Sequence, residues 1–308
     1  MKYKDWLEEW LENYIKPSVK TRTYEHYGQI VKLHIIPALG EYDLAELSVI
    51  VLQRFVADLL NSGNKKTNKG LSANFVNAVI SVIQNSLKTA HLIGVAPEYV
   101  AGKIKRSKTV EKQVDCFSVS EQKAIEQYVL NCKKDKLFGI VLCLYTGLRI
   151  GELLALTWED IDFAKGLLFV SKTCHDGNDG NKHIRIIDSP KTAHSRRVIP
   201  LPKQILPFLK NIKRRSKCEY IIADGSKPVF VRSYQRTFEL LLKKLDIPHK
   251  EFHSLRHTFA TRALECGMDV KTLSELLGHK NATVTLNRYA HSLMEHKTEM
   301  MNRLGKLL

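Results

Sequence analysis

Apolar side chains recur every three or four residues along much of the first hundred residues, which is the spacing of one face of an α-helix. The pattern predicts four helices within residues 1–100, which we interpret as a helical domain. Caps and breakers mark their ends: Pro17 closes the first, Pro37 and Gly40 end the second, Ser48 and Ser72 cap the third and fourth, and Gly94 stops the last. These stripes predict a hydrophobic core and indicate no chemistry of their own.

Helical spacing resumes near residue 118 and is later interrupted by a stretch with a different period. Ser118 or Ser120 can cap a helix through Tyr128, and further helices are expected at Leu137–Leu144 and from Ile150. Three short β-rich segments then predict a small three-stranded antiparallel sheet, namely Leu167–Thr173, His183–Asp188 and Arg196–Leu201. Helices continue to the end, so the fold class is mainly α with a small antiparallel β-sheet.

Composition excludes several classes of protein. The 308 residues are 44% apolar and 26% charged, which is a globular composition and not that of a disordered chain. No apolar run approaches the roughly 20 residues of a membrane span, and the acidic, amphipathic N-terminus has no signal-peptide core. The six cysteines lie at least 11 residues apart and form no CxxC pair. We therefore expect a cytoplasmic protein with reduced thiols and no membrane partner.

The net charge of +16 changes this picture, because it favours a polyanionic partner such as nucleic acid. Residues 1–100 hold 11 basic and 10 acidic side chains, whereas residues 101–308 hold 37 and 22. The positive charge therefore belongs to the second part of the chain, and a nucleoid-associated location would follow from DNA binding. Residues 101–115 carry five basic and two acidic side chains, and we interpret them as a basic linker.

The candidate chemistry lies in five short segments that concentrate arginine, histidine, lysine and tyrosine. They are Thr146–Glu152, Ser189–Thr192, His253–Phe259, Leu276–Lys280 and Asn287–His291. Taken singly, each is more typical of a surface or packing segment. The sequence has no phosphate-binding glycine loop and no spacing of metal ligands, so neither a nucleotide nor a metal cofactor is expected.

In this order and spacing, the five segments resemble the tyrosine recombinase family, which includes the integrases of phages and transposons. The motif positions are Arg149, Lys191, His253, Arg256, His279 and Tyr289, and residues 24–40 (YEHYGQIVKLHIIPALG) are typical of the N-terminal domain. The resemblance implies a SAM-like core-binding domain at residues 1–100, an interdomain linker at 101–115 and an α+β catalytic domain with a C-terminal tail at 116–308. It also implies a site-specific recombinase that cleaves and rejoins DNA through a 3′-phosphotyrosyl intermediate.

The side chains suit that chemistry. Arg149 and Arg256 carry planar, permanently charged guanidiniums that can contact a phosphate with two hydrogen bonds. His253 and Arg256 are three residues apart, so they share a helix face. Tyr289 is the nucleophile among these motifs, and a phosphotyrosyl bond conserves the energy of the broken linkage, so ATP is not needed.

The remaining roles follow from the resemblance. Lys191, expected in a turn between two strands, would be the general acid for the leaving 5′-oxygen. His253 would accept the tyrosine proton, and His279 would donate a hydrogen bond to a phosphate oxygen. Glu152 is expected to orient the arginines, with an ordinary helix salt bridge as the alternative. His257 is expected to pack without a catalytic role.

Exposed basic side chains are expected to bind DNA phosphates and to make the affinity depend on salt. The candidates are Lys65, Lys66 and Lys69 between the third and fourth helices, and Lys103, Lys105, Arg106 and Lys108 in the linker. The second domain adds Arg196, Arg197, Lys213, Arg214, Arg215, Arg232 and Arg236. Two domains joined by a basic segment predict a clamp around duplex DNA, and the resemblance implies that it is C-shaped and closes on core sites. A solvated linker is the alternative for residues 101–115.

The resemblance implies self-association into a tetrameric synaptic complex, with the tail after Tyr289 packing on a neighbouring protomer. A self-packed terminal helix is the alternative. The resemblance leaves open whether a DNA-bending protein or an excisionase takes part, and whether an arm-binding domain precedes this sequence. We interpret the chain as the integrase of a mobile element. A Xer-like dimer resolvase, a type IB topoisomerase and a catalytically silent DNA-binding relative are the alternatives.

Overall fold

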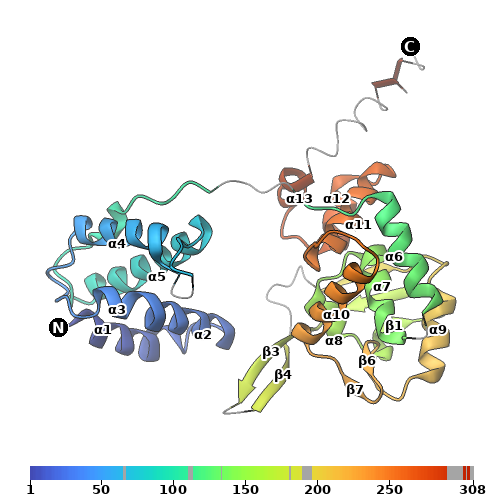
Figure 1. Ribbon diagram of the computed structural model, residues 1–308, viewed down its shortest axis with the longest axis horizontal. Coiled ribbons are helices and arrows are strands. Elements are labelled where there is room, and N and C mark those ends of the chain that lie inside the picture. Colours follow the sequence, from blue (N-terminus) through green and yellow to red (C-terminus); the bar gives the residue numbers. More distant parts are fainter. Residues whose placement is uncertain are drawn as a thin grey trace. The chain divides into compact units, whose positions relative to one another are not determined.

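The computed structural model describes residues 1–64, 67–109, 114–132, 134–179, 182–188, 196–289, 301–302 and 304–305. The chain divides into two compact units, Met1–Lys112 and Gln113–Leu308, and each has its own hydrophobic core. In Figure 1 the described part of the first unit is built of helices, whereas the second combines helices with short strands. The candidate motifs all belong to the second unit.

The first unit contains five α-helices, with two π-helical turns in the described chain between them. Their bounds are α1 (Tyr3–Trp10) with the turn Leu11–Ile15, α2 (Thr21–Ile30) with the turn Val31–Ile35, α3 (Ile36–Leu39), α4 (Val49–Ser62) and α5 (Ala73–Leu92). The hydroxyls of Ser48 and Ser72 accept hydrogen bonds from the first turns of α4 and α5, as predicted. The second helix was expected to end at Pro37 and Gly40. Pro37 lies in the first turn of α3, where no backbone N–H is needed, and the helical run continues to Leu39 with Gly40 as its C-cap.

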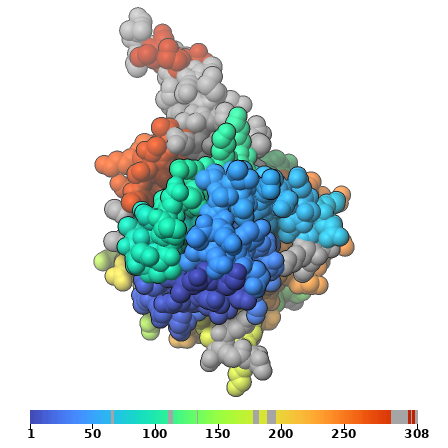
Figure 2. All heavy atoms as spheres, turned by 90° about the vertical axis from the view of Figure 1, so that its left-hand side faces the viewer, coloured from blue at the N-terminus to red at the C-terminus, as the bar shows by residue number. Residues whose placement is uncertain are grey.

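Helix α1 is held to α5 by its aromatic side chains. Trp6 and Trp10 are fully buried, and their indole N–H groups donate to the Ser86 carbonyl (3.1 Å) and the Thr89 hydroxyl (3.3 Å). The Tyr3 hydroxyl lies 2.7 Å from the hydroxyl of Ser86. Figure 2 shows α1, in dark blue, directly against the lighter blue residues that follow α3. Buried aromatic area with satisfied polar tips therefore stabilises this unit.

Part of the expected linker 101–115 belongs to the first unit instead. Ala101–Lys103 forms a 3₁₀ turn, and the Ile104 side chain is 5% exposed in the core of that unit. The Asn77 amide binds both the carbonyl (2.9 Å) and the N–H (3.0 Å) of Ser107. Residues 101–107 of the predicted basic linker are therefore fixed to the first unit, because Ile104 packs in its core and the Asn77 amide binds the backbone of Ser107.

The second unit contains eight helices within the described chain, together with short strands. The helices are α6 (Val119–Asn131), α7 (Phe138–Thr146), α8 (Ile150–Ala155), α9 (Leu206–Arg215), α10 (Val231–Lys244), α11 (His253–Glu265), α12 (Val270–Leu277) and α13 (Ala282–Tyr289); short 3₁₀ turns lie at Asp135–Leu137 and Trp158–Asp160. Ser118 caps α6 in a capping box with Glu121. Nearly every residue of α7 is buried, so this helix forms the centre of the core. Among the described helices, none is both long and apolar enough to cross a bilayer.

The strands are paired differently from the predicted single sheet of three. They are β1 (Ile161–Asp162), β2 (Leu167–Val170), β3 (Thr173–Asp179), β4 (Lys182–Asp188), β5 (Arg197–Pro200), β6 (Ala223–Asp224) and β7 (Lys227–Pro228). The three-stranded antiparallel sheet has the order β1-β2-β5, while β3 and β4 form a separate hairpin. The hairpin packs against α8 at Gly151, where an added Cβ would lie 2.6 Å from the Cys174 carbonyl. All seven residues of β3 pair with β4, which follows after only two residues, so β4 joins this hairpin and not the sheet.

Candidate active site

Two helices end at left-handed glycines beside the predicted catalytic arginines. Gly147 (φ 65°) ends α7, and Gly278 (φ 64°) ends α12. A Cβ at residue 147 would lie 2.5 Å from Phe259 and 2.8 Å from Leu277, so no larger residue fits there without movement. These glycines let both helices stop abruptly and present their last carbonyls, which carry the negative end of the helix dipole.

Arg256 lies on α11 and joins these two helix ends. Its side chain belongs to a residue that is 2% exposed, and its Nη1 donates to the Gly147 carbonyl at 2.7 Å. Its Nη2 donates to the Leu277 carbonyl at 2.6 Å. Carbonyls on two different helices therefore fix the plane of the guanidinium before any substrate is bound.

Glu152 pairs with two further arginines. Its carboxylate binds Nη1 of Arg149 at 2.7 Å and accepts two hydrogen bonds from Arg197, at 3.1 and 2.8 Å. It also accepts the backbone N–H of Arg149 at 2.9 Å, so it caps α8 as well. The side chains of Glu152 and Arg197 are both 5% exposed, whereas that of Arg149 is 38% exposed. Arg149 is thus the member of this group that solvent or a ligand reaches.

The end of α12 brings the three arginines to one place. The carbonyls of three consecutive residues, Leu276, Leu277 and Gly278, accept from Arg197 (2.6 Å), Arg256 (2.6 Å) and Arg149 (3.5 Å) respectively. Three cations therefore converge on one helix C-terminus, with the Glu152 carboxylate among them. Such a preorganised cationic cluster can stabilise negative charge that develops on phosphate oxygens.

Three histidines lie on the same or adjoining elements. His253 and His257 are one turn apart on α11, and their rings meet edge to face with centroids 4.6 Å apart. His257 is buried and His253 is half-buried. His279 follows Gly278, and its Nδ1 lies 2.7 Å from the hydroxyl of Thr285 on α13.

Two predicted catalytic residues are only partly described or not described. Lys191 lies outside the described residues. The described backbone of α13 ends at Tyr289, whose side chain is outside the description. The structure therefore brings together Arg149, Glu152 and Arg256, with His279 directly after Gly278 in the chain. The assignments of Lys191 and Tyr289 stay predictions.

Known proteins match this chain along nearly its whole length. A family model described as "Phage integrase family" matches residues 118–296, and a second, described as its N-terminal SAM-like domain, matches residues 2–60. The chain belongs to the phage integrase family. It is accordingly a site-specific recombinase, an enzyme that cleaves and rejoins DNA.

Proteins similar to this recombinase are named as tyrosine recombinases and as integrases. A protein named "Tyrosine recombinase XerC-like" from Caldanaerobacter subterraneus is 29% identical over 98% of this chain and 82% of that protein. The ICEBs1 integrase of Bacillus subtilis is 25% identical over 94% of this chain and 79% of that protein. The Tn1549 transposon integrase, solved with a circular intermediate DNA, shares the fold with a TM-score of 0.82 and 22% identity, covering 99% of both chains.

One positioning side chain of this family member was misassigned from the sequence. Arg197 was predicted as a DNA phosphate contact, and this is wrong because its side chain is buried on Glu152 and the Leu276 carbonyl. The alternation along β5 held the missed signal. Val198 is 44% exposed and Ile199 is 2% exposed, so Arg197 lies on the inward face of the strand.

In the first unit, the predicted DNA contacts that the structure describes lie at the surface, namely Lys69, Lys103, Lys105, Arg106 and Lys108. Arg106 donates to Ser81 (3.0 Å) and Gln84 (2.7 Å), and Lys103 pairs with Glu98. Lys65 and Lys66 lie outside the described residues. The segment before residue 109 therefore presents exposed cations on a fixed backbone, which suits phosphate binding.

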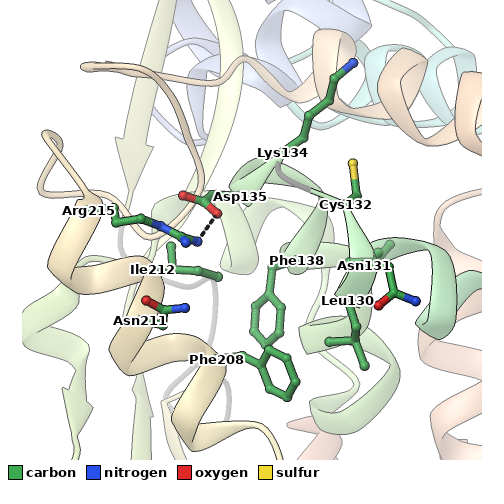
Figure 3. Close-up of a pocket in the computed structure, with 11 residues that line it drawn as sticks. Leu130, Asn131, Cys132, Lys134, Asp135, Phe138, Phe208, Asn211, Ile212 and Arg215 are labelled. Atoms are coloured by element: carbon green, nitrogen blue, oxygen red, sulfur yellow. Dashed lines mark hydrogen bonds and ion pairs between the residues drawn. The ribbon is translucent and has the colours of Figure 1, made fainter.

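Two cavities lie in the second unit. The larger, of about 540 Å³, lies between α6, α7 and α9, and Figure 3 shows Phe138 and Phe208 stacked there with Arg215 turned toward Asp135. None of the described motif residues lines it. The smaller, of about 260 Å³, is lined by His253 together with Leu148 and Ile150, which flank Arg149 in the chain. Among the predicted catalytic residues that the structure describes, only His253 lines this cavity.

Glu152 should also contribute to the pH dependence of folding. Burial alone would raise the pKa of its carboxyl, but the hydrogen bonds and charge of Arg197, with the charge of Arg149, lower that pKa from 4.5 to about 2. A lowered pKa in the folded state stabilises the fold above pH 4.5, and this stabilisation is lost as the pH falls toward 2. From the size of the shift, the contribution is roughly 3 kcal/mol.

We therefore expect Glu152→Gln to lower the free energy of unfolding at pH 7 by roughly 3 kcal/mol, because it leaves the buried Arg197 charge uncompensated. The variant should also lose stability less steeply than the unmodified protein between pH 4.5 and 2. Urea titrations at several pH values measure both effects. Glu239→Gln, at an exposed position on α10, is the matched control. Equal unfolding free energies for Glu152→Gln and the control would contradict this role.

Proposed function

We propose that this recombinase is the integrase of a mobile element and acts through Tyr289 and a 3′-phosphotyrosyl intermediate. The convergence of Arg149 and Arg256 on the carbonyls of consecutive residues at the end of α12 carries the proposal. Both are predicted phosphate ligands, and α13 ends at the predicted nucleophile only ten residues after His279. The ICEBs1 and Tn1549 integrases among its relatives support the assignment to a mobile element.

The cleavage step balances without a cofactor. The phenolic oxygen of Tyr289 attacks the scissile phosphorus, its proton passes to His253, and the bond from phosphorus to the 5′-oxygen breaks. Lys191 protonates that leaving oxygen, giving a free 5′-hydroxyl. Arg149, Arg256 and His279 bind the non-bridging oxygens, where negative charge grows in the transition state. Religation is the same step in reverse, with the 5′-hydroxyl of another strand as the nucleophile.

The same proposal covers how DNA is held. Exposed cations of the first unit, among them Lys69, Lys105 and Lys108, bind phosphates of a double-stranded core site, while the arginine cluster binds the scissile phosphate. Four protomers assemble on two core sites, and the chain after Tyr289 links neighbouring protomers. A location in the cytoplasm, on the nucleoid, completes the proposal.

Covalent trapping tests this function. The DNA flanking the gene supplies the inverted repeats for a suicide duplex that is nicked beside the cleavage position, so that the released fragment diffuses away. We expect a covalent protein–DNA adduct that forms in EDTA and without nucleotide and that resists boiling in detergent. DNA binding without any adduct would identify a catalytically silent relative and would contradict the proposal.

The XerC-like relative favours a second candidate, a resolvase of chromosome or plasmid dimers. The same repeats separate the two candidates in a plasmid recombination assay. An integrase should recombine an element end with an unlike target site, whereas a resolvase should recombine two identical minimal sites in direct repeat. Efficient recombination of identical minimal sites alone would overturn the mobile-element assignment while leaving the cleavage chemistry intact.

A further inference from the structure

We propose that Thr285 is a positioning residue, whose hydroxyl donates a hydrogen bond to Nδ1 of His279 and thereby keeps the proton of the neutral ring on Nε2. The inference rests on the proposed role of His279 as a hydrogen-bond donor to the phosphate. The Thr285 hydroxyl and His279 Nδ1 are 2.7 Å apart, and Thr285 is fully buried. A neutral imidazole donates from one nitrogen only, so the partner of Nδ1 decides whether Nε2 can donate.

The backbone of His279 is held independently of its ring. Gly278 ends α12 in the left-handed conformation, and the N–H of His279 donates to the Ser274 carbonyl at 3.0 Å. With the backbone held on one side and Nδ1 held on the other, the direction of Nε2 is determined. Thr285 therefore sets both the orientation and the tautomer of this ring.

The other helical hydroxyls of the chain favour one direction of this bond. The hydroxyls of Ser81, Thr89, Thr237 and Thr258 each donate to the carbonyl four residues earlier in their helix. Within the described residues, the Thr285 hydroxyl instead bonds to His279 alone. Its proton is thus available to the ring nitrogen, and a hydroxyl that donates to Nδ1 leaves Nε2 protonated.

The surrounding charges make this selection matter. The guanidiniums of Arg149, beside α8, and Arg256, on α11, bind the carbonyls of Gly278 and Leu277, the two residues before His279. Lys280 follows it, while Glu152 on α8 and Glu275 on α12 are the nearby anions in the described chain. A second proton on the ring would add positive charge to a cluster that already holds three arginines, so a neutral ring with a chosen tautomer supplies the donor instead.

The placement of Thr285 also connects the ring to the predicted nucleophile. Thr285 and Tyr289 are four residues apart, so both positions lie on the same side of α13. When this side of α13 packs on His279, the Thr285 hydroxyl binds Nδ1 of the ring, and position 289 is brought to the site with it. The donor is therefore fully formed only when α13 is in place.

The test compares Thr285→Val, which removes the hydroxyl and keeps the shape, with Thr285→Ser, which keeps the hydroxyl. We expect Thr285→Val to form the covalent adduct about 10- to 100-fold more slowly at pH 8, with DNA affinity unchanged. The defect should shrink as the pH falls and the ring takes a second proton, because an imidazolium donates from both nitrogens. Thr285→Ser should restore the rate, and Thr237→Val on α10 is the matched control.

Two outcomes would overturn this inference. One is a normal rate for Thr285→Val at pH 8, and the other is an equal defect at every pH that serine does not restore, which would indicate a packing role. His279→Gln, assayed in parallel, separates this failure from that of the proposed function. If His279→Gln is slow while Thr285→Val is normal, the role of His279 stands and only the tautomer control is lost.

Discussion

Tyr289→Phe is expected to abolish the covalent adduct while DNA binding persists. The substitution removes the phenolic oxygen, which is the only atom of the side chain able to attack phosphorus, and it keeps the ring and its volume. Loss of a nucleophile lowers the cleavage rate by more than about 10⁴-fold, so no adduct should accumulate during a normal assay. Gel electrophoresis under denaturing conditions measures the adduct, and a gel shift measures binding.

Tyr128→Phe provides the matched control, because it makes the same change on α6 in the same unit. It should form the adduct at the unmodified rate. An adduct formed by Tyr289→Phe would show that another residue is the nucleophile. Proteolysis of the adduct from the unmodified protein and mass spectrometry of the DNA-linked peptide would then identify that residue.

The helices of the first unit could be predicted because their cores are local in sequence. Trp6 and Trp10 are four residues apart, which places them on one side of a helix, and both are buried. The caps at Ser48, Ser72 and Ser118 need only a hydroxyl and three following residues, so they too could be read from the sequence. Order that is set within one helical turn is therefore recoverable from sequence alone.

Strand pairing could not be predicted in the same way. The β2 strand pairs with β1 and β5. Strand β1 is only two residues long, which is too short to show the alternation of apolar and polar residues that marks a strand. The hairpin of β3 and β4 packs against α8 at Gly151, where the absence of a side chain allows the backbones to approach. Long-range packing decided the pairing, and the alternation within each strand carried no information about it.

The site shows the same division. The motif spacing predicted Arg149 and Arg256, and the structure places both at the end of α12. The motif spacing could not predict that backbone carbonyls bind the two guanidiniums, because every residue carries the same carbonyl group. It also assigned Glu152 to the arginines in general, whereas the carboxylate pairs with Arg149 and Arg197, and Arg256 is bound by Gly147 and Leu277.

Arg256→Lys is expected to lower the cleavage rate by roughly 10³-fold, because removal of one preorganised donor to a developing oxyanion has an effect of that order. A lysine has a single ammonium group, so it cannot bind the Gly147 and Leu277 carbonyls in one plane and still present a fork to the phosphate. One of the two buried carbonyls loses its partner, which should also lower the free energy of unfolding by about 1–3 kcal/mol. Single-turnover adduct formation and urea titration measure the two effects.

The comparison with Arg149→Lys decides whether the loss reflects chemistry or folding. Arg149 is 38% exposed and keeps a carboxylate partner, so its lysine variant should lose cleavage sharply with a smaller change in stability. Arg54→Lys, exposed on α4 and not among the predicted DNA contacts, should change neither quantity. If both active-site variants cleave at the unmodified rate while still binding DNA, the arginines do not stabilise the transition state, and the convergence on α12 is structural only. If both lose cleavage but only Arg256→Lys loses stability, the end of α12 holds one arginine for folding and catalysis and the other chiefly for catalysis.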